Sequence, residues 1–325
     1  MSPGERLDLD KPMWSQDTFM GRLKYFAWIT DPRLSVCSSK QLYDAKTLLQ
    51  QYRAGTEPPG TDPKKVWRAQ QLYLSAFHPD TGDLQNVIGR MSFYVPGGMV
   101  LISGMVAFYK SNAAVIFWQW ANQSFNALVN YTNRNAESEI TPQRIGVAYV
   151  SATGSALAVA LGLKGQLAKR ASPLMQRFVP FAAVAAANMV NIPLMRQSEL
   201  LDGIAVYDEN NRKVTESRYA AVKGISQVTF SRILMAAPSM LLLPVMIQRF
   251  ETTAWFKRYP YINGPIQIGL SGIMLLIMVP IGCALFNQKS SIAVSRLATM
   301  DKKDLSVLES QFGSLPDRVY FNKGL

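Results

Sequence analysis

The sequence contains one histidine, His78, within Phe77-His78-Pro79-Asp80-Thr81-Gly82. One histidine leaves little room for histidine-based catalysis or metal binding. The triplet Asp80-Thr81-Gly82 resembles the one around aspartic-protease carboxylates, but those enzymes need two carboxylates that share a proton. No second Asp-Thr-Gly or Asp-Ser-Gly occurs. The segment therefore predicts either a proline turn capped by an aspartate or a loop that contacts a ligand or acts as a gate, with His78, Asp80 and Thr81 as candidates.

A second set of polar residues recurs at helical spacing. Gln119, Gln123, Asn126 and Asn130 are three or four residues apart, so they share one face of a helix. The opposite face is rich in aromatic residues. Such an amide face can line a water-filled passage or form hydrogen bonds between membrane helices, and it can also belong to a helix at the membrane interface.

A third set surrounds a proline at the end of an apolar segment. Asn188 and Asn191 are three residues apart, and Pro193 and Arg196 follow. Proline has no N–H to donate and clashes with the carbonyl four residues back, at Met189. This predicts either a substrate site, with amides, a free carbonyl and a positive charge, or a kinked helix packed through amide hydrogen bonds.

The elements that carry these residues are long apolar segments. About 20 mainly apolar residues in a helix cross the core of a bilayer. We expect an all-α, polytopic membrane protein with about five transmembrane helices. The expected regions are a soluble helical N-terminal region at 1–95, a five-span domain at 96–288 and a polar tail at 289–325. The expected spans are 97–120 (interrupted by Lys110), 145–163, 178–195, 224–248 and 259–288.

Smaller features add detail to these elements. In the N-terminal region, helices are expected at 39–52, with Ser39 as the N-cap, and at 62–76. Gly154, Ala158 and Gly162 form a row of small residues, which predicts close helix packing. Arg232 either lies inside the fourth span, where it needs a partner or a wet cavity, or flanks it.

Charge predicts an orientation. An odd number of spans puts the termini on opposite sides, and the basic loops at 164–177 and 249–258 would share the side of the N-terminus. The positive-inside rule then places the N-terminus on the inner side. The acidic start (Glu5, Asp8, Asp10) does not resemble a cleavable presequence.

Composition argues against several functions. The net charge is +12 with a pI near 9.7, yet no nucleic-acid motif or basic helix face occurs, so we expect no nucleic-acid partner. The two cysteines, Cys37 and Cys283, form no redox or zinc spacing. No phosphate loop, metal cluster or nucleophile elbow occurs. We therefore expect no enzyme activity, no cofactor and no metal site.

Several long motifs resemble the sideroflexin family, and together they cover essentially the whole chain. They are 77–82, 88–92, 117–126, 177–188, 191–197 and the terminal Val-Tyr-Phe-Asn-Lys-Gly-Leu at 319–325. Two further segments, 96–99 and 130–136, look most like one particular paralogue of that family.

This resemblance implies a mitochondrial inner-membrane protein with five spans, its N-terminus in the matrix and its C-terminus in the intermembrane space. It implies transport of serine, and of other small neutral amino acids, for one-carbon metabolism. It also implies links to iron and haem homeostasis, which we read as indirect because no iron ligands are evident. The alternative is a membrane scaffold or assembly factor without transport activity.

Overall fold

The computed structural model describes residues 6–78, 81–133, 141–167 and 172–302, and beyond them 306, 309–310, 313 and 315–323. These residues are mainly helical, and four of their helices are long and apolar enough to cross a membrane. They are Ile145–Leu167, Leu174–Met195, Arg218–Glu251 and Pro260–Ala284, and a shorter apolar helical segment spans Met91–Ala107. The predicted class, an all-α membrane protein, is confirmed.

The N-terminal region has an apolar core of its own. Its main helices are α1 (Phe19–Ile29), α2 (Ser39–Ala54) and α3 (Pro63–Ala76). Ser38, not Ser39, caps α2: its side chain accepts from the N–H of Gln41, and the Gln41 side chain accepts from Ser38 in return. Apolar faces of α2 and α3 pack around Leu34, Leu42, Leu49, Val66 and Phe77. Short 3-10 helices lie at Pro32–Val36, Val87–Gly89 and Met91–Phe93.

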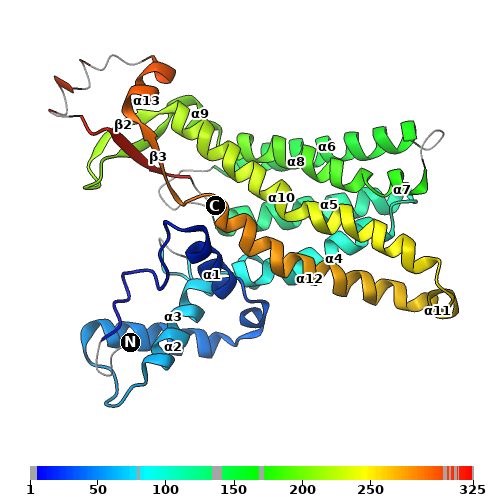
Figure 1. The fold of residues 1–325 in the computed structure, drawn as a ribbon, viewed down its shortest axis with the longest axis horizontal. Helices are drawn as coiled ribbons and strands as arrows, with labels where there is room; N and C mark the ends of the chain where they lie inside the picture. The colour runs from blue at the N-terminus through cyan, green and yellow to red at the C-terminus, as the bar shows by residue number, and fades with distance from the viewer. Residues whose placement is uncertain are drawn as a thin grey trace.

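Six helices of the described chain form the long bundle in Figure 1. They are α4 (Tyr94–Ala107), α5 (Asn112–Thr132), α6 (Pro142–Leu167), α8 (Val179–Met195), α10 (Arg218–Glu251) and α12 (Asn263–Ala284). The short helices α7 (Pro173–Gln176) and α11 (Ala254–Arg258) and a 3-10 turn at Pro260–Ile262 join them on the right of the view.

The bundle has two ends, which contacts identify. At the terminal end, Arg22 of α1 donates to the carbonyl of Ala284 at 2.8 Å, and Arg196 donates to the carbonyl of Lys323 at 2.7 Å. At the far end, Lys164 Nζ donates to the Lys110 carbonyl at 2.5 Å. Arg177 pairs there with Glu251 at 2.7 Å. Loops therefore alternate between the two ends along the chain.

The predicted first span at 97–120 is wrong as a single helix. The chain turns at Phe108–Ser111, where the Ser111 side chain caps α5. Rings of α5 lie against glycines of α4: a Cβ on Gly97 would lie 2.6 Å from the Phe125 ring, and one on Gly104 would lie 2.4 Å from the Trp118 ring. The partners run in opposite directions along the two helices, so α4 and α5 form an antiparallel hairpin.

A small sheet was not predicted. Its strands are β1 (Ile204–Tyr207), β2 (Lys213–Ser217), β3 (Lys289–Ala293) and β4 (Arg318–Asn322), in the order β2-β1-β4-β3 with antiparallel pairs. The helices α9 (Gln197–Asp202) and α13 (Val294–Asp301) flank it. The tail at 289–325 thus contributes two strands to the fold.

The extra helix changes the arrangement of the termini. The N-terminal region and the C-terminal tail lie at the same end of the bundle, as Arg22 and Lys323 show and as Figure 1 makes visible. The loops that carry α7 and α11 lie at the opposite end. The expectation of termini on opposite sides, with the basic loops beside the N-terminus, does not fit this arrangement, because it counted the hairpin as one crossing.

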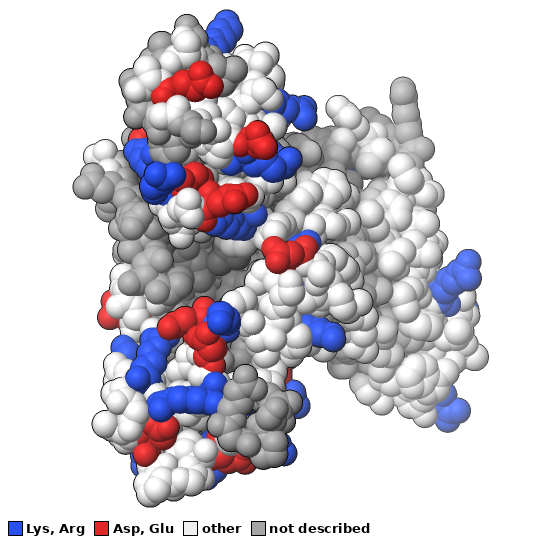
Figure 2. All heavy atoms as spheres, turned by 60° about the vertical axis from the view of Figure 1, so that its left-hand side comes forward, with Lys and Arg blue, Asp and Glu red and all other residues white. Residues whose placement is uncertain are grey.

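Charged side chains follow the same division. In Figure 2 they gather over the N-terminal helices and over the region of the sheet, whereas the bundle surface in view is mostly uncharged. Large apolar side chains are exposed on the bundle helices, among them Val150, Met189, Leu242 and Ile277. An apolar belt between polar ends is what a lipid bilayer requires.

Candidate functional site

Helix α5 buries its polar face and exposes its apolar face. Gln119, Asn122, Gln123 and Asn126 are only 1–8% exposed. On the opposite face Ile116, Phe117 and Trp120 are 42–53% exposed. A surface helix of a soluble protein has the reverse pattern. The arrangement suits a helix that meets lipid on its outside and a polar interior on its inside.

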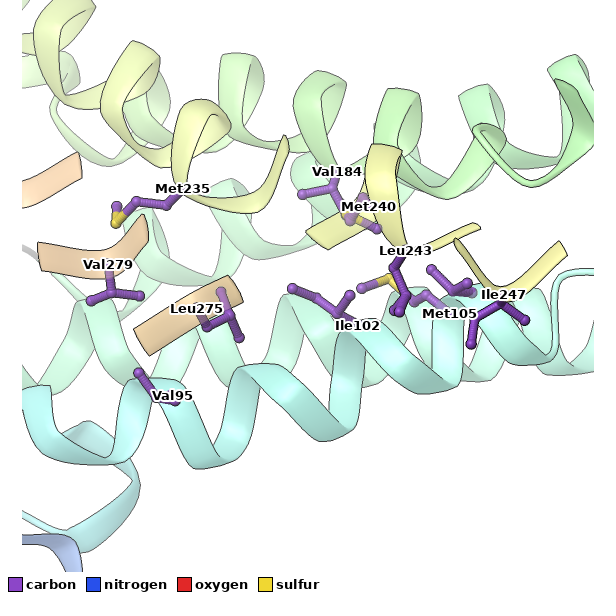
Figure 3. Close-up of a cluster of buried hydrophobic side chains, with 11 residues drawn as sticks. Val95, Ile102, Met105, Val184, Met235, Met240, Leu243, Ile247, Leu275 and Val279 are labelled. Atoms are coloured by element: carbon purple, nitrogen blue, oxygen red, sulfur yellow. The ribbon is translucent and has the colours of Figure 1, made fainter. Parts of the chain in front are cut away.

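Asn122 and Asn126 of this face line a cavity at the centre of the bundle, which holds about 40 Å³, room for a few water molecules. Its polar lining comes from Tyr94, Asn122, Asn126, Asn188 and Arg232. Its apolar lining comes from the core cluster of Figure 3, namely Ile102, Met105, Val184, Met235, Met240 and Leu275.

Several buried polar atoms of α5 and α10 have no protein partner among the described residues. Two of them, Asn122 Nδ2 and Arg232 Nη1, belong to residues that line the central cavity. The others are Gln119 Oε1 and Gln123 Nε2 on α5, and Ser231 Oγ and Ser239 Oγ on α10. An unsatisfied buried polar group costs about 1–3 kcal/mol, so such groups are rarely kept without a use. Water or a polar solute can satisfy them.

Arg232 resolves an alternative that the sequence left open. It lies inside α10 rather than at its edge, and its side chain lines the cavity. A charge at the centre of a membrane helix costs about 2.5–3.5 kcal/mol on insertion scales. No carboxylate of the described chain forms an ion pair with it, unlike Arg177 and Arg196. In the sequence Arg232 interrupts an apolar segment, but no local pattern places it near Asn122 or Asn126.

A second cavity continues along α5 toward the far end. It holds about 10 Å³, room for about one water molecule, and is lined by Gln119, Lys164 and Gln176, with apolar residues of α4, α5 and α8. Met105 lines both cavities and is 3% exposed. Gln119 and Asn122 lie one turn apart on the same face of α5, so one polar helix face borders both cavities. Met105 separates them.

The residues around Pro193 have different surroundings. Asn188 lines the central cavity, and its Nδ2 donates to the Val184 carbonyl at 2.9 Å. Asn191 is buried but does not line it. Pro193 lies in the last turn of α8. Arg196 is bound to the Glu199 carboxylate and the Lys323 carbonyl at the terminal end, away from Asn188.

The His78 loop lies in the N-terminal region. His78 is 9% exposed, its N–H donates to the Asp83 carbonyl at 2.9 Å, and its Nδ1 accepts from the Thr81 N–H at 3.4 Å. Lys46 of α2 donates to the Gly82 carbonyl at 2.7 Å. Asp80 lies outside the described residues. The lining of the central cavity includes neither His78 nor Thr81.

The small-residue row on α6 faces outward. Gly154, Ala158 and Gly162 are exposed, and a Cβ on Gly154 or Gly162 would meet no atom of the described chain within 4 Å. The packing predicted for this row is therefore not made with any part of the chain that the structure describes. The inward face of α6 carries Ala148, Ala152, Ala156 and Ala160 instead.

Comparison with known proteins places the whole chain in one family. The profile of the Sideroflexins matches residues 8–325. Sideroflexin-2 of Drosophila melanogaster is 53% identical, and Sideroflexin-2 and Sideroflexin-1 of Homo sapiens are each 50% identical; every alignment covers 98% of both chains. No solved structure gives a significant match. A profile match and half-identical relatives over nearly the full length show that this chain belongs to the sideroflexin family.

Proposed function

We propose that this protein transports small neutral amino acids, serine first among them, across the inner mitochondrial membrane. The observation that carries the proposal is the central cavity, which the unpartnered Asn122 amide of α5 and the Arg232 guanidinium of α10 both line inside an apolar bundle. Membrane transporters place polar groups at this depth where a solute binds. The membrane and the substrate rest on the family resemblance, as does the supply of serine to one-carbon metabolism.

The cavity holds the groups that a zwitterion requires. Asn122 Nδ2 is a free donor. Asn188 Nδ2 donates to the Val184 carbonyl, and the amide oxygen of Asn188 can accept a hydrogen bond from a solute. Pro244 has no N–H, so the Met240 carbonyl, one turn before it, lacks the usual helical partner. Amide oxygens and this carbonyl suit an ammonium group, and the donors suit a carboxylate and a hydroxyl.

The two cavities suggest a route through the bundle. A solute in the central cavity can pass Met105 into the second cavity, which opens toward Lys164 and Gln176 at the far end. Met105 is flexible and apolar, so a change of its rotamer is the simplest gate at this point. Among the described residues no group of three or more His, Cys, Asp or Glu side chains could hold a metal ion. We therefore propose that any link to iron or haem homeostasis is indirect.

A specific observation also supports a second candidate function. The exposed small residues of α6 provide a surface on which a partner helix could pack closely. A scaffold or assembly factor would use this surface and would not need the cavity to bind a solute.

Uptake of labelled serine into proteoliposomes that contain only this protein distinguishes the two functions. We expect saturable uptake, which Asn122→Leu together with Asn126→Leu abolishes while the protein still inserts. The matched control is Gly154→Leu on the outward face of α6, which should leave uptake unchanged. Absence of uptake by the wild-type protein, with correct insertion shown by protease digestion, would contradict transport and favour the scaffold.

A further inference from the structure

We infer that Arg232 binds the carboxylate of the transported molecule and is the residue that selects for this group. This inference rests on the proposed transport function and deepens it. Arg232 is the charged side chain that lines the central cavity, and its Nη1 is buried without a partner in the described chain.

The comparison with other arginines of the chain supports this assignment. Arg22 donates to three backbone carbonyls, of Gln16, Asp17 and Ala284. Arg177 is bound to the Glu251 carboxylate and Arg196 to that of Glu199. Arg232 has no equivalent partner in the described chain, and its side chain lines the central cavity. A planar guanidinium with free N–H groups matches a carboxylate in geometry as well as in charge.

The neighbours of Arg232 fit the rest of such a molecule. Asn122, Asn126 and Asn188 approach the same cavity from α5 and α8, and they supply uncharged donors and acceptors. Among the described residues, no acidic side chain lines the cavity. A cationic amine without a carboxylate would therefore face Arg232 unpaired, and like-charge repulsion would exclude it. The cavity thus favours a zwitterion or an anion over a cation.

The buried, unpartnered guanidinium of Arg232 should affect the stability of the protein. Removing a side chain that is bound within the protein lowers the stability of the fold. An unpaired buried charge, in contrast, destabilises the protein that contains it, so its removal raises stability. Arg232→Gln should therefore raise the melting temperature of the ligand-free protein in detergent. The same variant should lose the further stabilisation that serine gives to the wild-type protein.

The test combines thermal stability with uptake. The probes are serine, ethanolamine (which lacks the carboxylate), 3-hydroxypropanoate (which lacks the amine), sodium chloride and sodium phosphate. We expect serine to stabilise the wild-type protein, 3-hydroxypropanoate to do so weakly, and ethanolamine and the inorganic salts not at all. Arg232→Gln should weaken serine binding roughly 10- to 100-fold, the loss expected for a charged hydrogen bond. Arg232→Lys, which keeps the charge without the planar fork, should lie between.

Arg249→Gln, an exposed position at the end of the same helix, is the matched control and should change neither measurement. Competition by ethanolamine equal to that of serine, or unchanged serine binding by Arg232→Gln, would overturn the inference while leaving transport intact. Equal stabilisation by chloride or phosphate would show a simple anion site and would also overturn it. Serine binding without uptake would contradict only the transport function, and no stabilisation by either carboxylate would reject the role of Arg232 directly.

Discussion

Asn188 and Asn191 lie three residues apart on α8 but have different surroundings. Asn188 lines the central cavity, and Asn191 is buried outside it. We predict that Asn188→Leu lowers serine uptake about 3- to 30-fold, which corresponds to roughly 0.6–2 kcal/mol for one polar contact within a membrane. Asn191→Leu is the matched control and should retain uptake per inserted molecule. Equal losses in both variants would show that these amides act through helix packing.

Gln123 has a buried Nε2 without a partner in the described chain. Removing an unsatisfied buried group relieves a cost of about 1–3 kcal/mol, so we predict that Gln123→Leu raises the thermal stability of the purified protein. The control is Ser124→Ala, whose hydroxyl is bound to the Trp120 carbonyl and the Tyr149 hydroxyl and faces away from the amides. A destabilised Gln123→Leu variant would instead indicate that the amide is satisfied in the folded protein.

The sequence predicted which polar residues form the candidate site, but not that residues of α5, α8 and α10 line one cavity. The spacing of Gln119, Gln123 and Asn126 is local information, because a helix alone places them on one face. Whether that face looks inward depends on the packing of α4, α6 and α8 around it, which no local pattern contains. The same holds for Arg232, whose depth depends on where α10 begins.

Helices α4 and α5 pack through glycine and aromatic residues. A Cβ on Gly104 would lie 2.4 Å from the Trp118 ring, far inside van der Waals contact. We predict that Gly104→Ala destabilises the protein by about 1–3 kcal/mol, the usual range for overpacking. Gly269→Ala on α12, where nothing lies within 4 Å, is the control and should have little effect. Trp118→Leu should partly rescue Gly104→Ala, and thermal unfolding in detergent measures all of these variants.

The hairpin was read as one span for a clear physical reason. Lys110 is the only charge between Met91 and Asn133, so this whole region was predicted to contain a single span. The buried amides of α5 lower its mean hydropathy, so α5 did not stand out as a second apolar helix. In the structure Lys110 lies at the far end, where the chain turns. A single lysine in a long apolar region thus marked a turn rather than an interruption.

The whole molecule has both terminal regions at one end of the bundle. We therefore predict that N-terminal and C-terminal tags share one side of the membrane. Protease added to intact mitoplasts should either digest both tags or spare both, and detergent should expose both in either case. Digestion of one tag alone would show that α4 and α5 do not both cross the membrane.

The sheet escaped prediction because its strands are short and distant in sequence. β1 pairs with β4 through Tyr207 and Tyr320, more than a hundred residues apart. Strands of four or five residues give little periodic signal next to long apolar helices, and pairing over such a distance leaves none in the local sequence. The tail was accordingly expected to be a polar extension, although Phe321 is 1% exposed in the core.

The position of β4 has a consequence for chains that are cut short. Residues 318–322 complete the sheet, and the carbonyl of Lys323 receives Arg196 from the end of α8. These partners are far apart in the sequence, and closing so long a loop is slow. Neither contact can form in a chain that ends before residue 318. Such a chain would keep its bundle helices, but the terminal end would stay open.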